Sequence, residues 1–206
     1  MASKRESNFI NMVITLFVVS AVAALALGGV YTVTKEPIAL AKKKKLEAAI
    51  KTVLPEFDSI KTVKIALGDG QDSLVYYIAS KSDQVIGTAI KTYTMKGFSG
   101  KIELMVGMLQ DGTINNTAVV SHKETPGLGD KMDAKKSDFP RQFMGKNPVN
   151  YELNVTKDGG DVDAITAATI SSRAFCDAVK RATDSYMNQE ARAKNQDSSI
   201  KTNDNK

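Results

Sequence analysis

Two threonines, Thr166 and Thr169, stand where a long C-terminal helix is expected to begin. The first turn of a helix offers unpaired backbone N–H groups and a partial positive charge, which together favour a phosphate. We predict Thr166 as the N-cap, with Ala167 and Ala168 in the first turn and Thr169 about three residues into the helix. The small alanines leave room for a bulky group near the backbone. The pattern permits a phosphate ester on a threonine oxygen, although by itself it is more typical of an ordinary threonine-capped helix.

The scarcity of cysteine and histidine excludes most redox and metal chemistry by the protein itself. Cys176 is the only cysteine, so the chain has no intrachain disulfide and no cysteine-ligated iron–sulfur cluster. His122 is the only histidine, which excludes a multi-histidine metal site, and we predict neither a metal ligand nor a catalytic residue. Neither common glycine-rich phosphate loop is present. If the protein does redox work, it therefore needs an organic cofactor.

An apolar segment near the N-terminus is long enough to cross a membrane. No charged residue occurs from Ser7 to Thr34. A span needs about 20 apolar residues, whereas a cleaved signal peptide has an apolar core of about 7–15 residues. We predict a short tail at 1–8, an uncleaved transmembrane helix at 9–34 and an amphipathic connecting helix at 35–55. The apolar stripe of the connecting helix is formed by Ile38, Leu40, Leu46, Ala49, Ile50 and Val53.

The remaining chain predicts one α+β domain at 56–189. Alternating apolar residues and turn signals predict strands at 61–67, 74–80, 85–93, 102–109, 113–121 and 151–155. Glycine or aspartate turns separate them at 68–70, 82–83 and 110–112. A short helix is predicted at 138–144 and a long one at 166–188. Residues 190–206 have almost no apolar content, so we predict a disordered tail. The net charge of +5 is modest, and we expect no nucleic-acid partner.

The sequence Asp163-x-x-Thr166-Ala167-Ala168-Thr169 resembles the flavin attachment site of the FMN-binding subunits of the Rnf and Nqr ion-pumping redox complexes. The family pattern is Asp-x-x-(Ser/Thr)-Gly-Ala-(Ser/Thr), and its final hydroxyl residue carries FMN through a phosphoester bond. The resemblance thus implies covalent FMN on Thr169. This chain departs from the pattern at Ala167, where the family has glycine. If the glycine gives only backbone room, alanine in a helical first turn is expected to be tolerated.

Two further segments carry the same resemblance. They are Gly97-Phe-Ser-Gly100-Lys-Ile-Glu-Leu-Met-Val-Gly107 and His122-Lys-Glu-Thr-Pro-Gly-Leu-Gly-Asp-Lys131. The second segment, continued by Ser137-Asp138-Phe139, is more similar to the G subunits of Rnf-type complexes than to the C subunits of Nqr-type complexes. The resemblance extends from the apolar segment to about residue 182.

The loop at 124–131 suits a planar ring. Gly127, Gly129 and Pro126 let the backbone lie flat against the ring, with N–H and C=O groups available to its polar edge. Leu128 is placed to cover a ring face, and Lys131 to stabilise an anionic reduced flavin or its phosphate. The predicted cofactor contacts besides Thr169 are Asp163, Thr166, Ala167, Ala168, Glu124, Thr125, Gly127, Leu128, Gly129 and Lys131. Without the resemblance, the same loop is typical of a plain surface turn.

The resemblance implies an electron-transfer subunit with no independent catalytic activity. In such complexes electrons from NADH or ferredoxin pass through flavins and iron–sulfur centres, coupled to Na⁺ or H⁺ movement. The implied partners are the other subunits, a flavin transferase that attaches FMN, and the membrane. Two alternatives stay open: an Nqr-type C subunit, and a membrane-anchored binding or assembly module without a cofactor.

The predicted location is the cytoplasmic membrane, with a single span. The family places the flavin domain on the periplasmic or extracellular side. Lys35 and the lysines at 42–45 follow the span, and by the positive-inside rule they favour the cytoplasm for the same domain. We adopt the family's orientation, because a folding domain and partner subunits override local charge.

Overall fold

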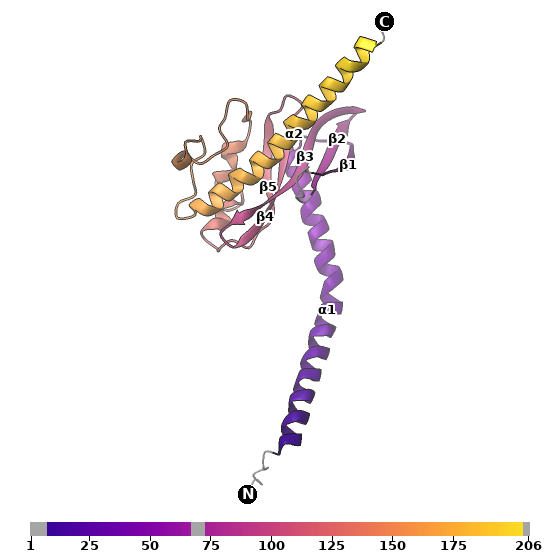
Figure 1. Ribbon diagram of the computed structural model, residues 1–206, viewed down its shortest axis with the longest axis vertical. Coiled ribbons are helices and arrows are strands. Elements are labelled where there is room, and N and C mark those ends of the chain that lie inside the picture. The colour runs from indigo at the N-terminus through magenta and orange to yellow at the C-terminus, as the bar shows by residue number, and fades with distance from the viewer. Residues whose placement is uncertain (1–7, 67–72, 204–206) are drawn as a thin grey trace. The chain divides into compact units, whose positions relative to one another are not determined.

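The computed structural model describes residues 8–66 and 73–203 (Figure 1). The chain divides into two units, Met1–Lys45 and Leu46–Lys206. The first unit contains most of helix α1 (Phe9–Val53), and in the described part of the chain α1 alone is long and apolar enough to cross a membrane. The second unit contains the sheet and helix α2 (Thr169–Asn203). An apolar helix followed by an α+β domain confirms the predicted fold class.

Threonine hydroxyls within the apolar stretch of α1 donate hydrogen bonds to the helix backbone. The hydroxyls of Thr15 and Thr34 each donate to a carbonyl oxygen one turn earlier, at 2.7 Å. Such bonds matter in hydrocarbon, where no water is available to an unpaired polar group.

α1 is one continuous helix, whereas the sequence predicted separate helices at 9–34 and 35–55. Pro37 lies inside it, although proline removes a backbone donor and commonly ends or bends a helix. The predicted apolar stripe is buried only at its end. Ile38 and Leu40 are exposed, whereas Ala49, Ile50 and Val53 are buried.

Five strands form one antiparallel sheet in sequence order. Their bounds are β1 (Ser59–Ile65), β2 (Leu74–Lys81), β3 (Gln84–Gly97), β4 (Gly100–Met108) and β5 (Ile114–Ser121). The predicted strands between 61 and 121 agree with these within a few residues, apart from β3, which continues to Gly97. The end of the first predicted strand at 67 and the turn at 68–70 lie outside the described residues.

Tight turns join the strands where the sequence has residues that tolerate positive φ. Ser82 and Asp83 have φ of 49° and 62°, which is typical of the two-residue hairpin turn whose twist matches the strands. Gly112 has φ of 80° in the β4–β5 turn, where its N–H donates to the carbonyl oxygen of Leu109 at 3.1 Å. Both turns were predicted from the sequence.

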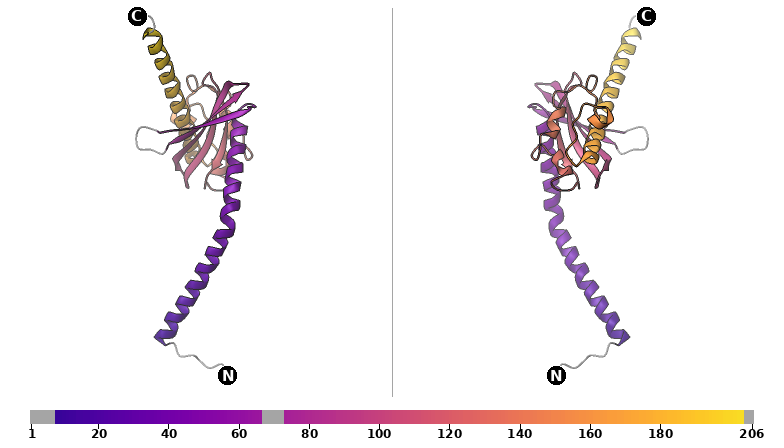
Figure 2. Two further views of the ribbon diagram at one scale, coloured as in Figure 1. Left: turned by 90° about the vertical axis from the view of Figure 1, so that its right-hand side faces the viewer. Right: turned by 90° about the vertical axis from the view of Figure 1, so that its left-hand side faces the viewer.

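The two faces of the sheet pack against different helices (Figure 2). On one face, Ile90, Leu104 and Val106 pack against the buried side of α2. On the other, Ala89 and Met105 pack against the final turns of α1, which belong to the same unit as the sheet. Because side chains alternate along a strand, neighbouring residues serve opposite layers.

The segment between β5 and α2 contains three short 3₁₀ helices. They are η1 (Gly129–Met132), η2 (Phe139–Phe143) and η3 (Thr156–Asp158). η2 corresponds to the short helix predicted at 138–144. Its two phenylalanines pack edge-on and tilted against Phe175 of α2, with ring centroids 5.0–5.2 Å from it. This aromatic contact ties the connecting segment to the helix.

Two predicted boundaries differ from the structure. The strand predicted at 151–155 is wrong, because Val155 makes only an isolated parallel bridge to Val162. α2 continues to Asn203, past residue 190, where the sequence analysis began a disordered tail. The alanine, glutamate, glutamine, lysine and arginine residues just beyond 189 have high helix propensity, which accounts for the continuation.

The end of α1 is fixed to the sheet by β5. The side-chain amides of Asn115 and Asn116 donate to the carbonyl oxygens of Val53 and Thr52, at 2.9 and 3.1 Å. These carbonyls have no partner within the helix, so the amides act as its C-terminal cap. Gly107 makes the close approach feasible, since a Cβ there would lie 1.9 Å from the carbonyl oxygen of Val53.

Gly107→Ala is therefore expected to destabilise the domain by about 3 kcal/mol, because the added methyl group forces α1 away from the sheet. Urea unfolding of the full chain in detergent micelles measures the change. Gly28→Ala is the control, since nothing lies within 4 Å of a Cβ at that position. Equal unfolding midpoints for the two variants would contradict the packing described.

Candidate functional site

A tight turn precedes α2 and sets where the helix begins. The N–H of Ala168 donates to the carbonyl oxygen of Ile165 at 3.0 Å, and Ala167 has φ of +62°. The third residue of such a turn commonly needs positive φ, which favours glycine. The helix then begins at Thr169. The prediction that Thr166 is the N-cap and that both alanines lie in the first turn is therefore wrong.

Ser172 holds the turn against the helix. Its buried hydroxyl accepts the N–H of Ile165 at 2.9 Å and donates to the carbonyl oxygen of Ala168 at 3.0 Å. The N–H of Ser172 donates to the same carbonyl at 3.0 Å. One side chain thereby satisfies both ends of the turn, and this offsets the strain at Ala167.

The first three backbone N–H groups of α2 have no hydrogen-bond acceptor in the described chain. Ser172 makes the first helical hydrogen bond, which leaves the N–H groups of Thr169, Ile170 and Ser171 without one among the residues the structure describes. Unpaired N–H groups at a helix start, together with the helix dipole, form a site for a phosphate. Thr169 itself, as the first helical residue, carries its hydroxyl at this site.

The loop predicted to face a ring folds back on itself beside this helix start. The N–H of Leu128 donates to the carbonyl oxygen of Thr125 at 3.2 Å, and Gly127 adopts φ of +78° between them. Glycine is suited to that conformation because it has no Cβ. The fold therefore brings two of the motifs recognised in the sequence side by side.

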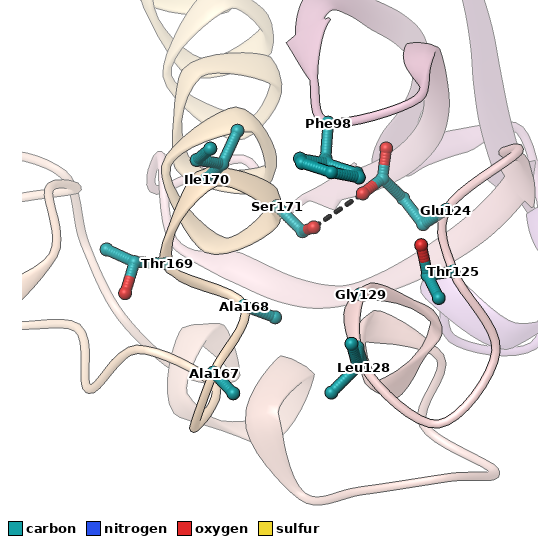
Figure 3. Close-up of a pocket in the computed structure, with 10 residues that line it drawn as sticks. All are labelled: Phe98, Glu124, Thr125, Leu128, Gly129, Ala167, Ala168, Thr169, Ile170 and Ser171. Atoms are coloured by element: carbon teal, nitrogen blue, oxygen red, sulfur yellow. Dashed lines mark hydrogen bonds between the residues drawn. The ribbon is translucent and has the colours of Figure 1, made fainter.

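A cavity of about 330 Å³ lies between the loop and the helix start (Figure 3). This is at the lower end of the roughly 300–1,000 Å³ typical of ligand sites. Its walls are formed mainly by apolar groups and backbone. The lining residues are Phe98, Glu124, Thr125, Leu128, Gly129, Ala167, Ala168, Thr169, Ile170 and Ser171.

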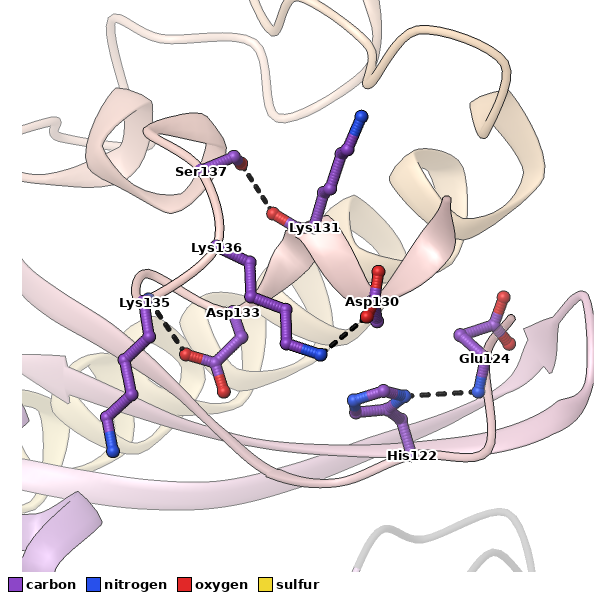
Figure 4. Close-up of polar contacts among 8 residues, drawn as sticks. All are labelled: His122, Glu124, Asp130, Lys131, Asp133, Lys135, Lys136 and Ser137. Atoms are coloured by element: carbon purple, nitrogen blue, oxygen red, sulfur yellow. Dashed lines mark hydrogen bonds and ion pairs between the residues drawn. The ribbon is translucent and has the colours of Figure 1, made fainter. Parts of the chain in front are cut away.

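Four predicted site residues lie outside the cavity lining. Asp163 and Thr166 are exposed, and the backbone of Asp163 is held by the side chain of Gln142 at 2.8 and 3.1 Å. Gly127 shapes the loop without lining the cavity. Lys131 lies in η1, and its side chain points away from Asp130 (Figure 4).

Phe98, Ile170 and Ser171 line the cavity but were not predicted as site residues. Phe98 lies at the tip of the β3–β4 turn and is 67% exposed, which is unusual for a phenylalanine. Phe98 lies in a segment that was recognised in the sequence, and its aromatic side chain beside two turn residues was the available signal. Ile170 and Ser171 follow Thr169 directly, and no sequence pattern distinguishes them from ordinary helix residues.

The side chain of Thr169 projects away from the cavity in Figure 3. A group attached to its oxygen would therefore begin at the outer side of the helix start. To reach the cavity it would pass over Ala167 and Ala168, whose side chains are the smallest that carry a Cβ. The donors at the helix start, the small side chains beside them and the apolar cavity fit a phosphate joined to a planar ring by a flexible chain.

One buried charge near the loop, that of Asp130, is paired. Asp130 is almost fully buried, and Lys136 contacts its carboxylate at 2.5 Å, which holds the pKa of Asp130 below its ordinary value (Figure 4). Farther along α2, burial raises the pKa of the Cys176 thiol to about 12, so this residue packs as an inert apolar group. Among the described residues no cluster of three His, Cys, Asp or Glu side chains is arranged to hold a metal ion.

Comparison with known proteins supports the family resemblance that the motifs carry. The FMN-binding domain family matches residues 97–184. The G subunit of the ion-translocating oxidoreductase complex from Aliivibrio fischeri strain ES114 is 36% identical, with 84% of this chain and 86% of the relative aligned. The protein of the same name from Vibrio atlanticus is 34% identical over 89% and 91% of the two chains, and that of Erwinia tasmaniensis is 46% identical over 52% of each.

The chain belongs to this G-subunit family. Recognition of the family from its motifs is confirmed. Every residue that lines the cavity lies within the matched FMN-binding domain. The match argues against a module that lacks a cofactor, and the relatives carry the G-subunit name rather than that of an Nqr-type C subunit.

The positive φ of Ala167 allows a test of the departure from the family pattern at this position. Ala167→Gly is expected to stabilise the domain by about 1 kcal/mol, because it removes the strain of a Cβ at positive φ. Ala168→Gly is the matched control and is expected to lower stability, since Ala168 is buried and does not have positive φ. Urea unfolding midpoints of the two variants give the comparison. No gain for Ala167→Gly would show that the backbone at 167 is unstrained.

Proposed function

We propose that this chain carries FMN as a phosphoester on Thr169 and relays electrons as the G subunit of an ion-translocating oxidoreductase complex. One observation carries the proposal. Thr169 stands at a helix start whose first three N–H groups have no acceptor among the described residues, beside an apolar cavity inside the FMN-binding domain.

Two groups of residues would hold the two parts of the cofactor, its phosphate and its ring. The N–H groups of Thr169, Ile170 and Ser171 would bind the phosphate, whose negative charge the helix dipole stabilises. Phe98 and Leu128, on opposite sides of the cavity, would cover the faces of the ring and exclude water from it. When bound, FMN supplies the redox chemistry by accepting and returning electrons. Covalent attachment would keep the cofactor in place where it cannot be replaced from the cytoplasm.

The predicted residues outside the cavity receive different roles. Asp163 and Thr166 are exposed beside the acceptor hydroxyl, and Gln142 fixes the backbone of Asp163. That placement suits contact with a flavin transferase better than contact with a buried ring. The Lys131 ammonium group forms no ion pair with the described residues, and we assign it to the phosphate or to the reduced, anionic flavin.

The apolar part of α1 supplies the membrane anchor. An apolar helix near the N-terminus and the name of the relatives fit a membrane-bound protein. We further propose a single span of the cytoplasmic membrane, with the flavin domain on the periplasmic or extracellular side. The other subunits of the complex would be its partners, and electron flow would be coupled to Na⁺ or H⁺ transport.

Thr169→Val is expected to give a folded protein without covalent flavin. The substitution preserves shape, and within the described chain the Thr169 hydroxyl makes no hydrogen bond whose loss would affect folding. The full chain is produced together with a flavin transferase. Intact-mass spectrometry and in-gel flavin fluorescence then measure attachment.

Thr156→Val is the control, because Thr156 is exposed in η3 and does not line the cavity. It is expected to keep most of its flavin. In-gel flavin fluorescence that persists in Thr169→Val would contradict the assignment of the attachment site. A colourless wild-type protein of unmodified mass would favour the module without a cofactor.

The orientation of the domain is tested separately in intact spheroplasts. Externally added protease is expected to digest the C-terminal domain, as the family's orientation requires. Full protection of the domain would place it in the cytoplasm, as the lysines at 42–45 suggest by the positive-inside rule. A cytoplasmic protein that stays intact throughout serves as the control for lysis.

A further inference from the structure

Glu124 was predicted to contact the cofactor, but the structure gives its carboxylate another position. The residue is only 4% exposed, and both carboxylate oxygens accept hydrogen bonds from the protein. Oε1 accepts the backbone N–H of Ser99 at 2.9 Å. Oε2 accepts the hydroxyl of Ser171 at 2.5 Å, as the dashed line in Figure 3 shows. Each oxygen thus already accepts one hydrogen bond from the protein, and the carboxylate retains further lone pairs.

These two hydrogen bonds connect the three segments that form the cavity. Ser99 lies in the β3–β4 turn beside Phe98, Ser171 lies in the first turn of α2 beside Thr169, and Glu124 begins the loop that contains Leu128. No other hydrogen bond within the described residues joins these three segments to one another. The shape of the cavity therefore depends on one carboxylate.

The neighbouring glycines make room for that carboxylate. A Cβ at Gly129 would lie 2.4 Å from the Ser171 hydroxyl oxygen and 2.7 Å from Oε2 of Glu124. A Cβ at Gly97 would lie 2.8 Å from Oε1 of the same side chain. A Cβ atom essentially never lies within 3.0 Å of a non-bonded heavy atom, so a side chain at either position would force its neighbours to shift. The glycine at 129, which the sequence analysis assigned to the approach of a ring, is required by the contact between the loop and the helix.

The start of the Glu124 loop is also fixed. Its backbone N–H donates to Nδ1 of His122 at 3.1 Å (Figure 4). In the described chain Glu124 forms no salt bridge. The donors to its carboxylate are neutral, and the start of α2 adds a partial positive charge, because Ser171 is the third residue of the helix. Moving this buried carboxylate away from its donors would leave it without hydrogen-bond partners, which costs free energy.

We propose that Glu124 is a positioning residue whose carboxylate holds Phe98, Leu128 and Thr169 in the arrangement that accepts and covers a flavin. The flavin part of this inference rests on the proposed function. Ser171 is the second half of the contact. Loss of the carboxylate would let the β3–β4 turn and the loop move apart from the helix start, so that Thr169 and the two ring-covering residues no longer line one cavity.

The first experiment needs no cofactor. Hydrogen exchange of the full chain, produced without a flavin transferase, is compared for wild type, Glu124→Gln and Glu124→Ala. Glu124→Ala is expected to accelerate exchange of the Ser99 N–H by about tenfold or more, because that group loses its acceptor. Glu124→Gln keeps an acceptor oxygen and is expected to stay within about threefold of wild type. Unchanged exchange at Ser99 and residues 124–130 in Glu124→Ala would overturn the proposal.

The second experiment reads the effect on the flavin. With a flavin transferase present, Glu124→Ala is expected to reduce the rate of covalent attachment about tenfold and to weaken the visible circular dichroism of the attached flavin. Glu124→Gln is expected to restore both. Glu152→Ala, which removes an acid with a half-exposed side chain, is the control and is expected to behave as wild type. Wild-type attachment and dichroism in Glu124→Ala would overturn the positioning role.

A third variant covers the case in which Glu124→Ala does not fold. Ser171→Ala removes only the hydrogen bond to the helix and leaves the one to Ser99 in place. It is expected to slow attachment while leaving Ser99 exchange unchanged, and unaltered attachment would contradict the proposal. If wild type itself never acquires flavin, the proposed function fails, but the exchange data still decide whether Glu124 holds the cavity together.

Discussion

The packing of α2 across one face of the sheet is the constraint on which the rest of the structure depends. Phe175, Val179 and Ala182 are fully buried in this contact. Two hydrogen bonds fix the helix along its axis: the hydroxyl of Thr92 donates to the carbonyl oxygen of Ala178 at 2.9 Å, and that of Tyr76 donates to Ser185 at 2.8 Å. Because the helix can neither slide nor rotate on the sheet, its first residue has one position. The unpaired N–H groups at that position are held without any contribution from the ligand they would bind, which lowers the cost of ordering on binding.

The opposite face of the same sheet holds the end of α1. Asn115 and Asn116 cap that helix from β5, and Gly107 on β4 lets its backbone approach. The contacts of the sheet with α1 and with α2 use alternate residues of the same strands, so a residue in one contact can change without changing the other. The cavity is lined by the β3–β4 turn, the loop and the start of α2, and contains no residue of α1. The end of α1 and the cavity therefore use separate residues, although both depend on the central strands.

Much of the fold was readable from the sequence because its signals are local. Alternation of apolar residues predicted the β strands, and aspartate and glycine residues marked the turns. Other features depend on contacts between distant segments. The start of α2 was misplaced because a threonine normally indicates an N-cap, whereas here Ser172 from within the helix closes the preceding turn. The hydrogen bonds of Glu124 to Ser99 and Ser171, respectively 25 and 47 residues away, were not predicted because no local pattern shows them. Phe98 was missed for the same reason, since only the fold brings a hairpin tip to a helix start.

The alanine at 167 takes on a different meaning once its backbone conformation is known. A glycine in a helical first turn would serve only to leave space, but at φ of +62° it relieves strain of about 1–2 kcal/mol. That amount is small beside the roughly 5–15 kcal/mol by which domains are stable, so the turn persists with alanine in place. The hydrogen bonds of Ser172 and Ala168 define the turn independently of the side chain at 167. The exposed Ala167 methyl group adds bulk on the cavity side of the helix start, whereas the side chain of Thr169 projects away from the cavity (Figure 3). Under the proposed attachment at Thr169, any effect of this departure is expected in the approach of the modifying group, and not in the geometry that presents the residue.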